Sequence, residues 1–154
     1  MEDTEIRNEK DPVRALRRLI DALRGENGCP WDRKQTPHSM SVYLIEEVFE
    51  LVDAIETGNR EAVCEELGDV LFQLFFVIQM YQSAGEFGLH EVIEQNLDKM
   101  IRRHPHVFGH QQADTPEQVR INWNQNKRKE NRQGNSGRRL VYGGPFSKRG
   151  SRLV

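Results

Sequence analysis

The sequence predicts an all-α fold, and three observations support this prediction. Apolar residues recur every three or four positions in five separate segments, which is the spacing of one helix face. Residues that favour helix starts and helix ends bound these segments. No segment of useful length alternates polar and apolar residues as a half-buried strand would. We therefore expect an antiparallel helical bundle of four to five helices.

The first predicted helix begins near the N-terminus. Asp11 followed by Pro12 is a favourable start, and apolar residues then recur at helical spacing until Gly25. The following residues 25–35 contain two glycines and Pro30, so we expect a loop there.

The second and third predicted helices form a hairpin. Thr36 is a good N-cap for a helix over about residues 37–57, which ends at Gly58. The third helix follows at once and covers about residues 60–84. Because the connection is so short, we expect the two helices to be antiparallel neighbours.

Two more helices complete the predicted domain. One covers about residues 89–103 and is ended by Pro105, and the other runs from Thr115 to about residue 131. The predicted organisation is an N-terminal tail, one all-α domain and a basic flexible tail, over residues 1–10, 11–131 and 132–154 respectively.

Length and composition restrict the class of protein. At 154 residues and 18.0 kDa the chain fits one domain with tails. No stretch reaches the roughly 18 apolar residues that a membrane span needs, and the polar N-terminus does not resemble a signal peptide. Cys29 and Cys64 have neither metal-knuckle nor redox spacing. We expect a reduced, cytoplasmic protein without a membrane contact.

The charge is distributed unevenly along the chain. Residues 127–154 hold nine Lys and Arg against Glu130 alone, whereas residues 1–126 hold 13 against 23 Asp and Glu. A basic tail of this kind could contact nucleic acid or an acidic partner, or it could simply be solvated. Both interpretations stay open at the level of the sequence.

The third predicted helix suggests an assembly. From Val70 to Tyr81 it is apolar nearly all round, so it must be covered on nearly all sides. The other helices of a monomer could cover it, but a second copy of the chain would do so more completely. The sequence therefore favours a homodimer that completes the bundle.

Two pairs of carboxylates are predicted to converge within the hairpin. Glu47 and Glu50 are three residues apart on the second helix, and Glu66 and Asp69 repeat this spacing on the third. Glu50 and Glu66 lie eight residues before and after Gly58, so the pairs should lie at about the same height. Four bare carboxylates would repel strongly, which favours either protonation or a bound cation. Oxygen ligands point to Mg²⁺ or Mn²⁺.

A solvated surface and a di-iron site are the alternatives to a magnesium site. Most acidic residues of amphipathic helices lie on the surface, and this interpretation suits acids such as Glu56 and Glu61. Glu66 and Asp69 flank Gly68 at the start of the most apolar segment, where acids need a specific partner. A di-iron carboxylate site would add a histidine at Glu-x-x-His spacing, and none of the five histidines has it.

Five segments of the chain resemble one known family. The pattern EExxE at Glu46–Glu50 followed by ExxD at Glu66–Asp69 is similar to the signature of the MazG nucleotide pyrophosphohydrolases, within the all-α NTP pyrophosphatase superfamily. The supporting segments are GCPWDRKQT (28–36), YLIEEVFELVDAI (43–55), CEELGDVLFQ (64–73), IRRHPHVFG (101–109) and INWNQNK (121–127). The resemblance covers roughly residues 16–129.

The resemblance implies a function and its site residues. Members of this family are expected to be helical dimers that hydrolyse a nucleoside triphosphate between the α and β phosphates with Mg²⁺. Carried over residue by residue, the metal ligands are Glu47, Glu50, Glu66 and Asp69. Glu46 belongs to the same motif, and we predict that it positions or deprotonates the attacking water. The catalytic candidates are therefore Glu46 and its neighbour, the metal ligand Glu47.

Cationic and aromatic residues are candidates for holding the nucleotide. The phosphates need Lys or Arg, and Lys99, Arg102 and Arg103 lie on the fourth helix with Asn96 on the face of Lys99. Arg102 and Arg103 could instead compensate the helix dipole. Trp31 and Trp123 could each contact the nucleotide or simply pack.

The alternative function is a non-catalytic, nucleotide-sensing or nucleic-acid-associated helical regulator. It would keep the fold and lose the ligands, yet every acid of the signature is present. The sequence leaves open the preferred base and sugar, the number of metal ions and the physiological role.

Overall fold

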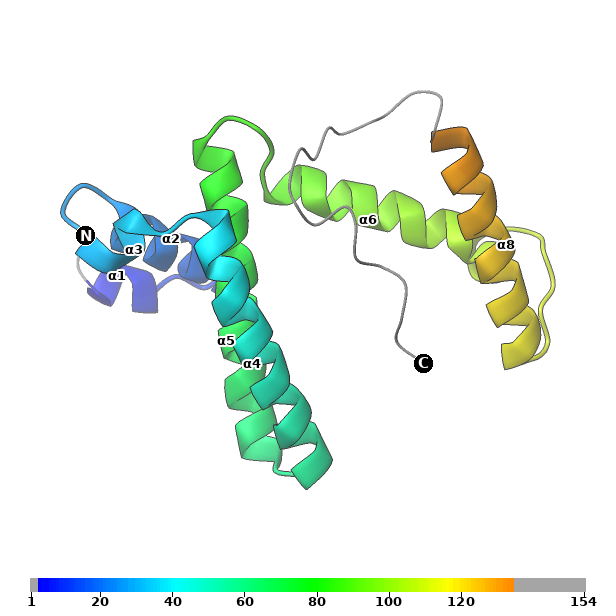
Figure 1. The fold of residues 1–154 in the computed structure, drawn as a ribbon, viewed down its shortest axis with the longest axis horizontal. Helices are drawn as coiled ribbons and strands as arrows, with labels where there is room; N and C mark the ends of the chain where they lie inside the picture. The colour runs from blue at the N-terminus through cyan, green and yellow to red at the C-terminus, as the bar shows by residue number, and fades with distance from the viewer. Residues whose placement is uncertain (1–2, 135–154) are drawn as a thin grey trace. The chain divides into compact units, whose positions relative to one another are not determined.

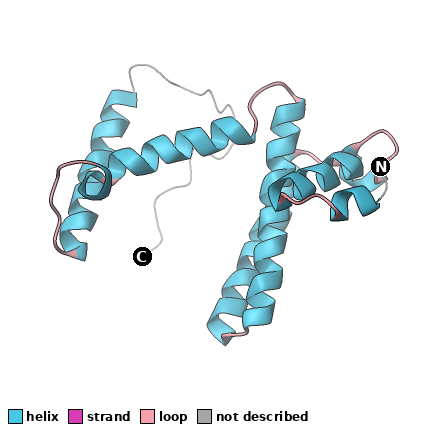
Figure 2. Ribbon diagram, turned by 180° about the vertical axis from the view of Figure 1, so that it is seen from behind, coloured by secondary structure: helices cyan, strands magenta, loops and turns pink. Residues whose placement is uncertain are grey.

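The structure is a computed structural model that describes residues 3–134, and all regular elements among them are α-helices. The all-α prediction is confirmed, and every described segment in Figure 2 is either helix or loop. The chain divides into two compact units, Met1–Glu94 and Gln95–Val154, and each is described by itself. The predicted single domain of residues 11–131 therefore stays a prediction. From residue 135 onward the predicted basic tail lies outside the described residues.

The five predicted helices are present. They are α2 (Pro12–Arg24), α4 (Pro37–Thr57), α5 (Arg60–Ser83), α6 (Leu89–Arg103) and α8 (Pro116–Gly134). Three short helices were not predicted, namely α1 (Asp3–Arg7), α3 (Pro30–Lys34) and α7 (Pro105–Phe108). At four or five residues each they are too short to show helical periodicity in the sequence.

Two of these short helices correct the predictions made from the sequence. Helix α3 lies in the segment 25–35 that was expected to be a loop, and Pro30 begins it because proline has the backbone angle of a first helical turn. Helix α1 lies within the expected N-terminal tail, where acids in its first turn and Arg7 in its last suit the helix dipole.

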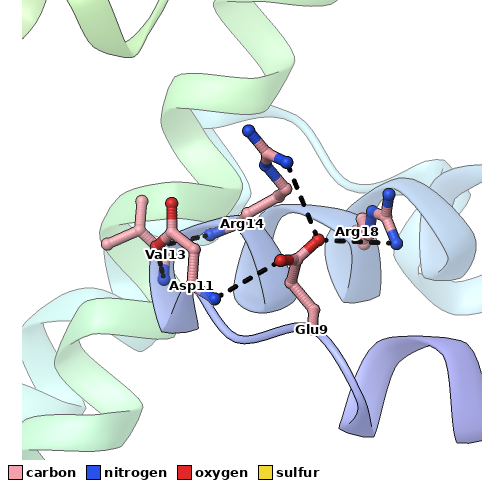
Figure 3. A network of polar contacts seen from close by, with 5 residues as sticks. All are labelled: Glu9, Asp11, Val13, Arg14 and Arg18. Carbon is pink, nitrogen blue, oxygen red and sulfur yellow. Dashed lines mark hydrogen bonds and ion pairs between the residues drawn. The ribbon is translucent and has the colours of Figure 1, made fainter.

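A polar network fixes the start of α2 (Figure 3). The Asp11 side chain accepts hydrogen bonds from the backbone N–H groups of Val13 and Arg14. The carboxylate of Glu9 accepts from the Asp11 backbone N–H at 3.3 Å and lies 3.6 Å from the guanidinium of Arg18. The predicted start at Asp11 is confirmed, and Glu9 supports it from the preceding turn.

The helices α4 and α5 form a long antiparallel hairpin in both ribbon views (Figures 1 and 2). Thr36 caps α4 in a capping box with Ser39, and Asn59 caps α5. Between the helices, Gly58 has φ of 71°, a left-handed conformation that glycine adopts without strain. The predicted hairpin is confirmed, with the end of α4 and the start of α5 where the sequence placed them.

The core of the first unit lies where α2 packs against the hairpin. Its buried residues are Ile20, Met40, Phe76 and Met80. Gln73 is buried on the same face of α5 as Phe76 and Met80. The other face of α5 is left open by the residues that the structure describes, and Leu71 on it is 48% exposed. None of the described helices is long and apolar enough to cross a membrane.

Candidate metal centre and active site

The hairpin positions the predicted carboxylates opposite one another. With only Gly58 and Asn59 between the helices, residues at equal distances from the turn lie at the same level of the hairpin. This geometry brings together Glu47 of α4 with Glu66 and Asp69 of α5. One carboxylate oxygen from each of the three lies within 4.8 Å of the other two.

Burial and mutual repulsion raise the pKa values of two of these acids. Burial is the main cause for Glu47, and the negative charges of Asp69, Glu50 and Glu46 add to it, while a hydrogen bond from Gln73 acts in the opposite direction. The pKa of Glu66 is likewise raised by burial first and by Glu50 and Asp69 next. A cation among the oxygens would remove the repulsion that raises both values.

The donor set suits a hard divalent cation. Glu47 and Glu66 are half-buried and Asp69 is exposed, so the site is open on one side. Oxygen Oε2 of Glu66 is buried and has no hydrogen-bond partner among the residues that the structure describes. A buried carboxylate oxygen without a partner is costly, and a cation would satisfy it. Carboxylate oxygens alone match Mg²⁺ or Mn²⁺ better than zinc.

Glu50, the fourth predicted ligand, lies beside this group rather than within it. It is exposed on α4 and contributes electrostatically to the raised pKa of Glu66. Glu50 and Glu66 both line a surface cavity of about 520 Å³, which also includes Phe49 and Asp53. The cavity lies between the hairpin helices towards their connection. A rotamer change of the exposed Glu50 side chain is sufficient to vary its distance from the other acids.

Gln73 is a residue of the site that reasoning from the sequence missed. Its side chain is 8% exposed, and its Nε2 donates a hydrogen bond to Oε1 of Glu47 at 3.4 Å. In the sequence it stands out only as a polar interruption of an apolar run. The spacing held a signal, because Gln73 follows Asp69 by four residues and Glu66 by seven, which places all three on one face of α5.

The remaining candidates of the first unit lie on exposed positions. Glu46 precedes Glu47 on α4 and is exposed. The ring of Trp31, on α3, is 49% exposed and meets the ring of Tyr43 edge to face at 5.4 Å between centroids. The roles of Glu46 and Trp31 stay predictions.

The other substrate-binding candidates belong to the second unit. Asn96 is exposed on α6, and Lys99 is half-buried without an ion pair to any residue that the structure describes. Arg103 is engaged within the unit, since its Nη2 lies 2.6 Å from the carboxylate of Glu130 and its guanidinium lies over the Trp123 ring at 5.1 Å.

Neighbouring contacts extend this arrangement. Arg102 lies 3.5 Å from the same Glu130 carboxylate, and the ring of Trp123 meets that of His104 at 5.0 Å between centroids. The packing interpretations of Arg103 and Trp123 therefore have direct contacts in their favour. Phosphate binding by Arg103 would need its guanidinium to exchange Glu130 for the substrate, and it stays a prediction together with the roles of Asn96, Lys99, Arg102 and Trp123.

Comparisons with known proteins identify the family. The MazG nucleotide pyrophosphohydrolase domain matches residues 35–108, which contain the four predicted metal ligands. The chain is 50% identical over 91 residues to the nucleoside triphosphate pyrophosphohydrolase/pyrophosphatase MazG of Thermotoga maritima, covering 59% of this chain and 36% of that protein. It is 42% identical over 118 residues to the nucleoside triphosphate pyrophosphohydrolase of Escherichia coli K12, covering 77% of this chain and 44% of that protein. It thus spans less than half the length of these relatives.

A solved structure agrees with the fold and the family. The crystal structure of a MazG-related protein from Thermotoga maritima superposes with a TM-score of 0.64 and 25% identity, over 75% of this chain and 99% of that chain. The matched domain, the relatives and the carboxylates on the α4–α5 hairpin agree with one another. This chain belongs to the MazG nucleotide pyrophosphohydrolase family.

Proposed function

We propose that this chain hydrolyses nucleoside triphosphates between the α and β phosphates, with Mg²⁺ or Mn²⁺ held at the α4–α5 hairpin. The products are a nucleoside monophosphate and pyrophosphate. The observation that carries the proposal is the convergence of Glu47, Glu66 and Asp69, whose oxygens lie within 4.8 Å of one another. The family, and the activity after which two relatives are named, support the substrate class.

The site needs a cation for a simple electrostatic reason. A triphosphate and a cluster of carboxylates are both strongly negative, so they repel each other unless positive charge lies between them. A divalent cation held there would supply positive charge to the phosphates and would help to activate water. Glu47, Glu50, Glu66 and Asp69 would hold the ion. Glu50 lines the neighbouring cavity and is exposed, so its side chain is free to join the other three.

The remaining roles follow from charge and position. We assign Glu46 to orienting the water and accepting its proton, which is a role that an exposed carboxylate beside the ligand Glu47 can fill. We assign Lys99, Arg102 and Arg103 to the phosphates and Asn96 to ribose or phosphate. Near-normal turnover by the Glu46→Gln variant would remove the role given to Glu46.

A second copy of the chain is part of the proposal. The outward faces of the hairpin carry a series of exposed apolar side chains, namely Ile45, Val48, Phe49, Val52 and Ile55 on α4 and Leu67, Leu71 and Leu74 on α5. Many exposed apolar side chains on two neighbouring helices are typical of a protein interface. Two such hairpins would form a four-helix bundle. Sedimentation at micromolar concentration would show a dimer, and Leu71→Glu would shift it to the monomer.

The activity is tested by product analysis. The protein is incubated with each canonical and several oxidised nucleoside triphosphates and Mg²⁺, and pyrophosphate and monophosphate are measured together. Equal amounts of both products, without diphosphate, would support cleavage between the α and β phosphates, and the panel would reveal the preferred base. Glu66→Gln should lose the activity, and the exposed Glu61→Gln on the same helix should keep it.

The same assay separates the proposal from a regulatory role. A protein that binds Mg²⁺ but releases no pyrophosphate from any triphosphate would be a nucleotide-sensing or nucleic-acid-associated helical protein instead. In that case the basic residues 127–154 become the first segment to examine for nucleic-acid contact. Formation of diphosphate and phosphate would keep the metal centre and contradict the proposed bond.

A further inference from the structure

Gln73 is a buried amide at the interface between α4 and α5. Its side chain is 8% exposed, and it lies on the helix face that also carries Glu66 and Asp69. The amide Nε2 donates to Oε1 of Glu47 at 3.4 Å, which joins two helices through residues 26 positions apart. Gln73 interrupts an otherwise apolar run of the sequence from Val70 to Ile78, so a specific use of its buried polar atoms is expected.

The orientation of the Gln73 amide follows from the charge of its partner. An ionised carboxylate can only accept hydrogen bonds, so the amide nitrogen and not the amide oxygen must face Glu47. Oxygen Oε1 of Gln73 is then directed elsewhere, and it is buried without a hydrogen-bond partner in the described part of the chain. A buried amide carbonyl in a native protein is almost always paired with a donor from protein or from ordered water.

A second acceptor in the same interface has the same need. Oε2 of Glu66 is also buried, and no described residue forms a hydrogen bond with it. Neither Glu47 nor Asp69 can donate to these oxygens while ionised. A divalent cation would satisfy a carboxylate oxygen directly, and a water that the cation retains would satisfy an amide oxygen. Mg²⁺ retains several such waters when it is bound by carboxylates.

We propose that Gln73 is a positioning residue of the metal centre, through both ends of its amide. Its N–H group fixes the carboxylate of Glu47 towards the ion, and its carbonyl oxygen accepts a hydrogen bond from one of the waters that the ion retains. The inference rests on the proposed function, because it assumes a cation among Glu47, Glu66 and Asp69. Outer groups of this kind typically change metal affinity by about 10–100-fold when they are removed.

The test replaces the amide with an apolar side chain of similar length. Gln73→Met removes the donor and the acceptor and keeps the side-chain length. The matched control is Gln79→Met, because Gln79 is also on α5 and its Nε2 also donates to a carboxylate, that of Asp21 on α2. Mn²⁺ affinity is measured by electron paramagnetic resonance without nucleotide. We expect binding weakened by about 10–100-fold in Gln73→Met and unchanged in Gln79→Met.

Two further measurements separate positioning from a purely structural role. Turnover of Gln73→Met should recover as the Mn²⁺ concentration is raised, since the ligands themselves remain. The melting temperature of Gln73→Met in EDTA should stay close to that of the wild type, because the variant loses the hydrogen bond to Glu47 and also loses the unpaired buried carbonyl, and these two effects oppose each other. A structural role predicts a lower melting temperature in EDTA and wild-type Mn²⁺ affinity, and that pair of results would overturn the inference.

Each remaining outcome has a defined meaning. If Gln73→Met is not helical by circular dichroism, Gln73→Leu takes its place in the same measurements. If the wild type binds Mn²⁺ and releases pyrophosphate while both variants bind Mn²⁺ equally well, the role of Gln73 is wrong and the proposed function survives. If the wild type takes up no Mn²⁺, the metal centre is wrong and the role of Gln73 is wrong with it.

Discussion

Neutralising Glu47 should have opposite effects on stability without and with Mg²⁺. In the metal-free protein Glu47 faces Asp69 and Glu66, with one oxygen of each within 4.8 Å of the others. Glu47→Gln removes one of these charges and keeps an oxygen that can accept the hydrogen bond from Gln73. The variant should therefore be more stable than the wild type in EDTA and should gain little from Mg²⁺.

The magnitude can be bounded from the geometry of Glu47 and Asp69. Two unit charges at the limiting distance of 4.8 Å repel by about 3.5 kcal/mol at an effective dielectric of 20 and by about 0.9 kcal/mol at that of water. Asp69 is exposed, so the value should lie near the lower bound. We expect a gain of about 1 kcal/mol, or about 2–4 °C in melting temperature for a chain of this size. Mg²⁺ at 100 times its dissociation constant should stabilise the wild type by about 2.7 kcal/mol.

The assay is scanning calorimetry in EDTA and in saturating Mg²⁺ at matched ionic strength. Glu47→Gln should melt above the wild type in EDTA and below it in Mg²⁺. The control is Glu56→Gln, because Glu56 is an exposed acid on the same helix and outside the group of converging oxygens. A variant that melts below the wild type in EDTA, or one that retains the full Mg²⁺-dependent rise, would refute the electrostatic reasoning.

Three further changes have defined outcomes. The pKa values of Glu47 and Glu66 are raised above their ordinary value of 4.5, so the folded protein is favoured in full below pH 4.5 and loses this stability as the pH rises through the raised values. In calorimetry, the metal-free wild type should therefore lose stability over this pH range relative to the E47Q/E66Q variant. Arg103 lowers the pKa of Glu130, whose contribution is present above 4.5 and lost as the pH falls through the lowered value. Glu130→Gln should therefore lower the free energy of opening of α8, measured by hydrogen exchange, by about 1 kcal/mol at neutral pH and should leave it unchanged in strong acid. Gly68→Ala should stabilise dilute protein by about 1 kcal/mol in urea unfolding, because a Cβ there meets no atom within 4 Å.

The parts of the fold that the sequence predicted are those that local chemistry determines. Thr36 and Asn59 cap their helices with their own side chains, and Gly58 supplies the left-handed turn between them. These contacts span three residues or fewer, so they are visible in the order of the residues. The N-cap of helix α3 is instead Cys29, whose side chain makes no capping bond, and the helix is only five residues long. It therefore left no pattern that could be recognised.

For a related reason, the carboxylates of the site could be predicted from the sequence, whereas the residues that contact them could not. Glu66 and Asp69 are recognisable as acids on one helix face, and the hairpin then determines their neighbours on α4. The contact of Gln73 with Glu47 joins positions 26 residues apart, and a single polar residue within an apolar run can have many roles. The engagement of Arg103 by Glu130 is similarly distant, over 27 residues. Contacts of this range depend on the packing of helices and not on their individual patterns.

At the level of the metal centre, α5 has polar residues on its inner face and apolar residues on its outer face. This arrangement connects the fold to the function. An ordinary amphipathic helix buries its apolar face and exposes its acids. Here Glu66 and Gln73 face α4 inside the hairpin, while Leu67 and Leu71 are 46% and 48% exposed on the outside. Burying polar groups and exposing leucines both cost stability, so the hairpin alone gives no reason for this arrangement. A cation that satisfies the inner face and a second copy that covers the outer face would together account for it.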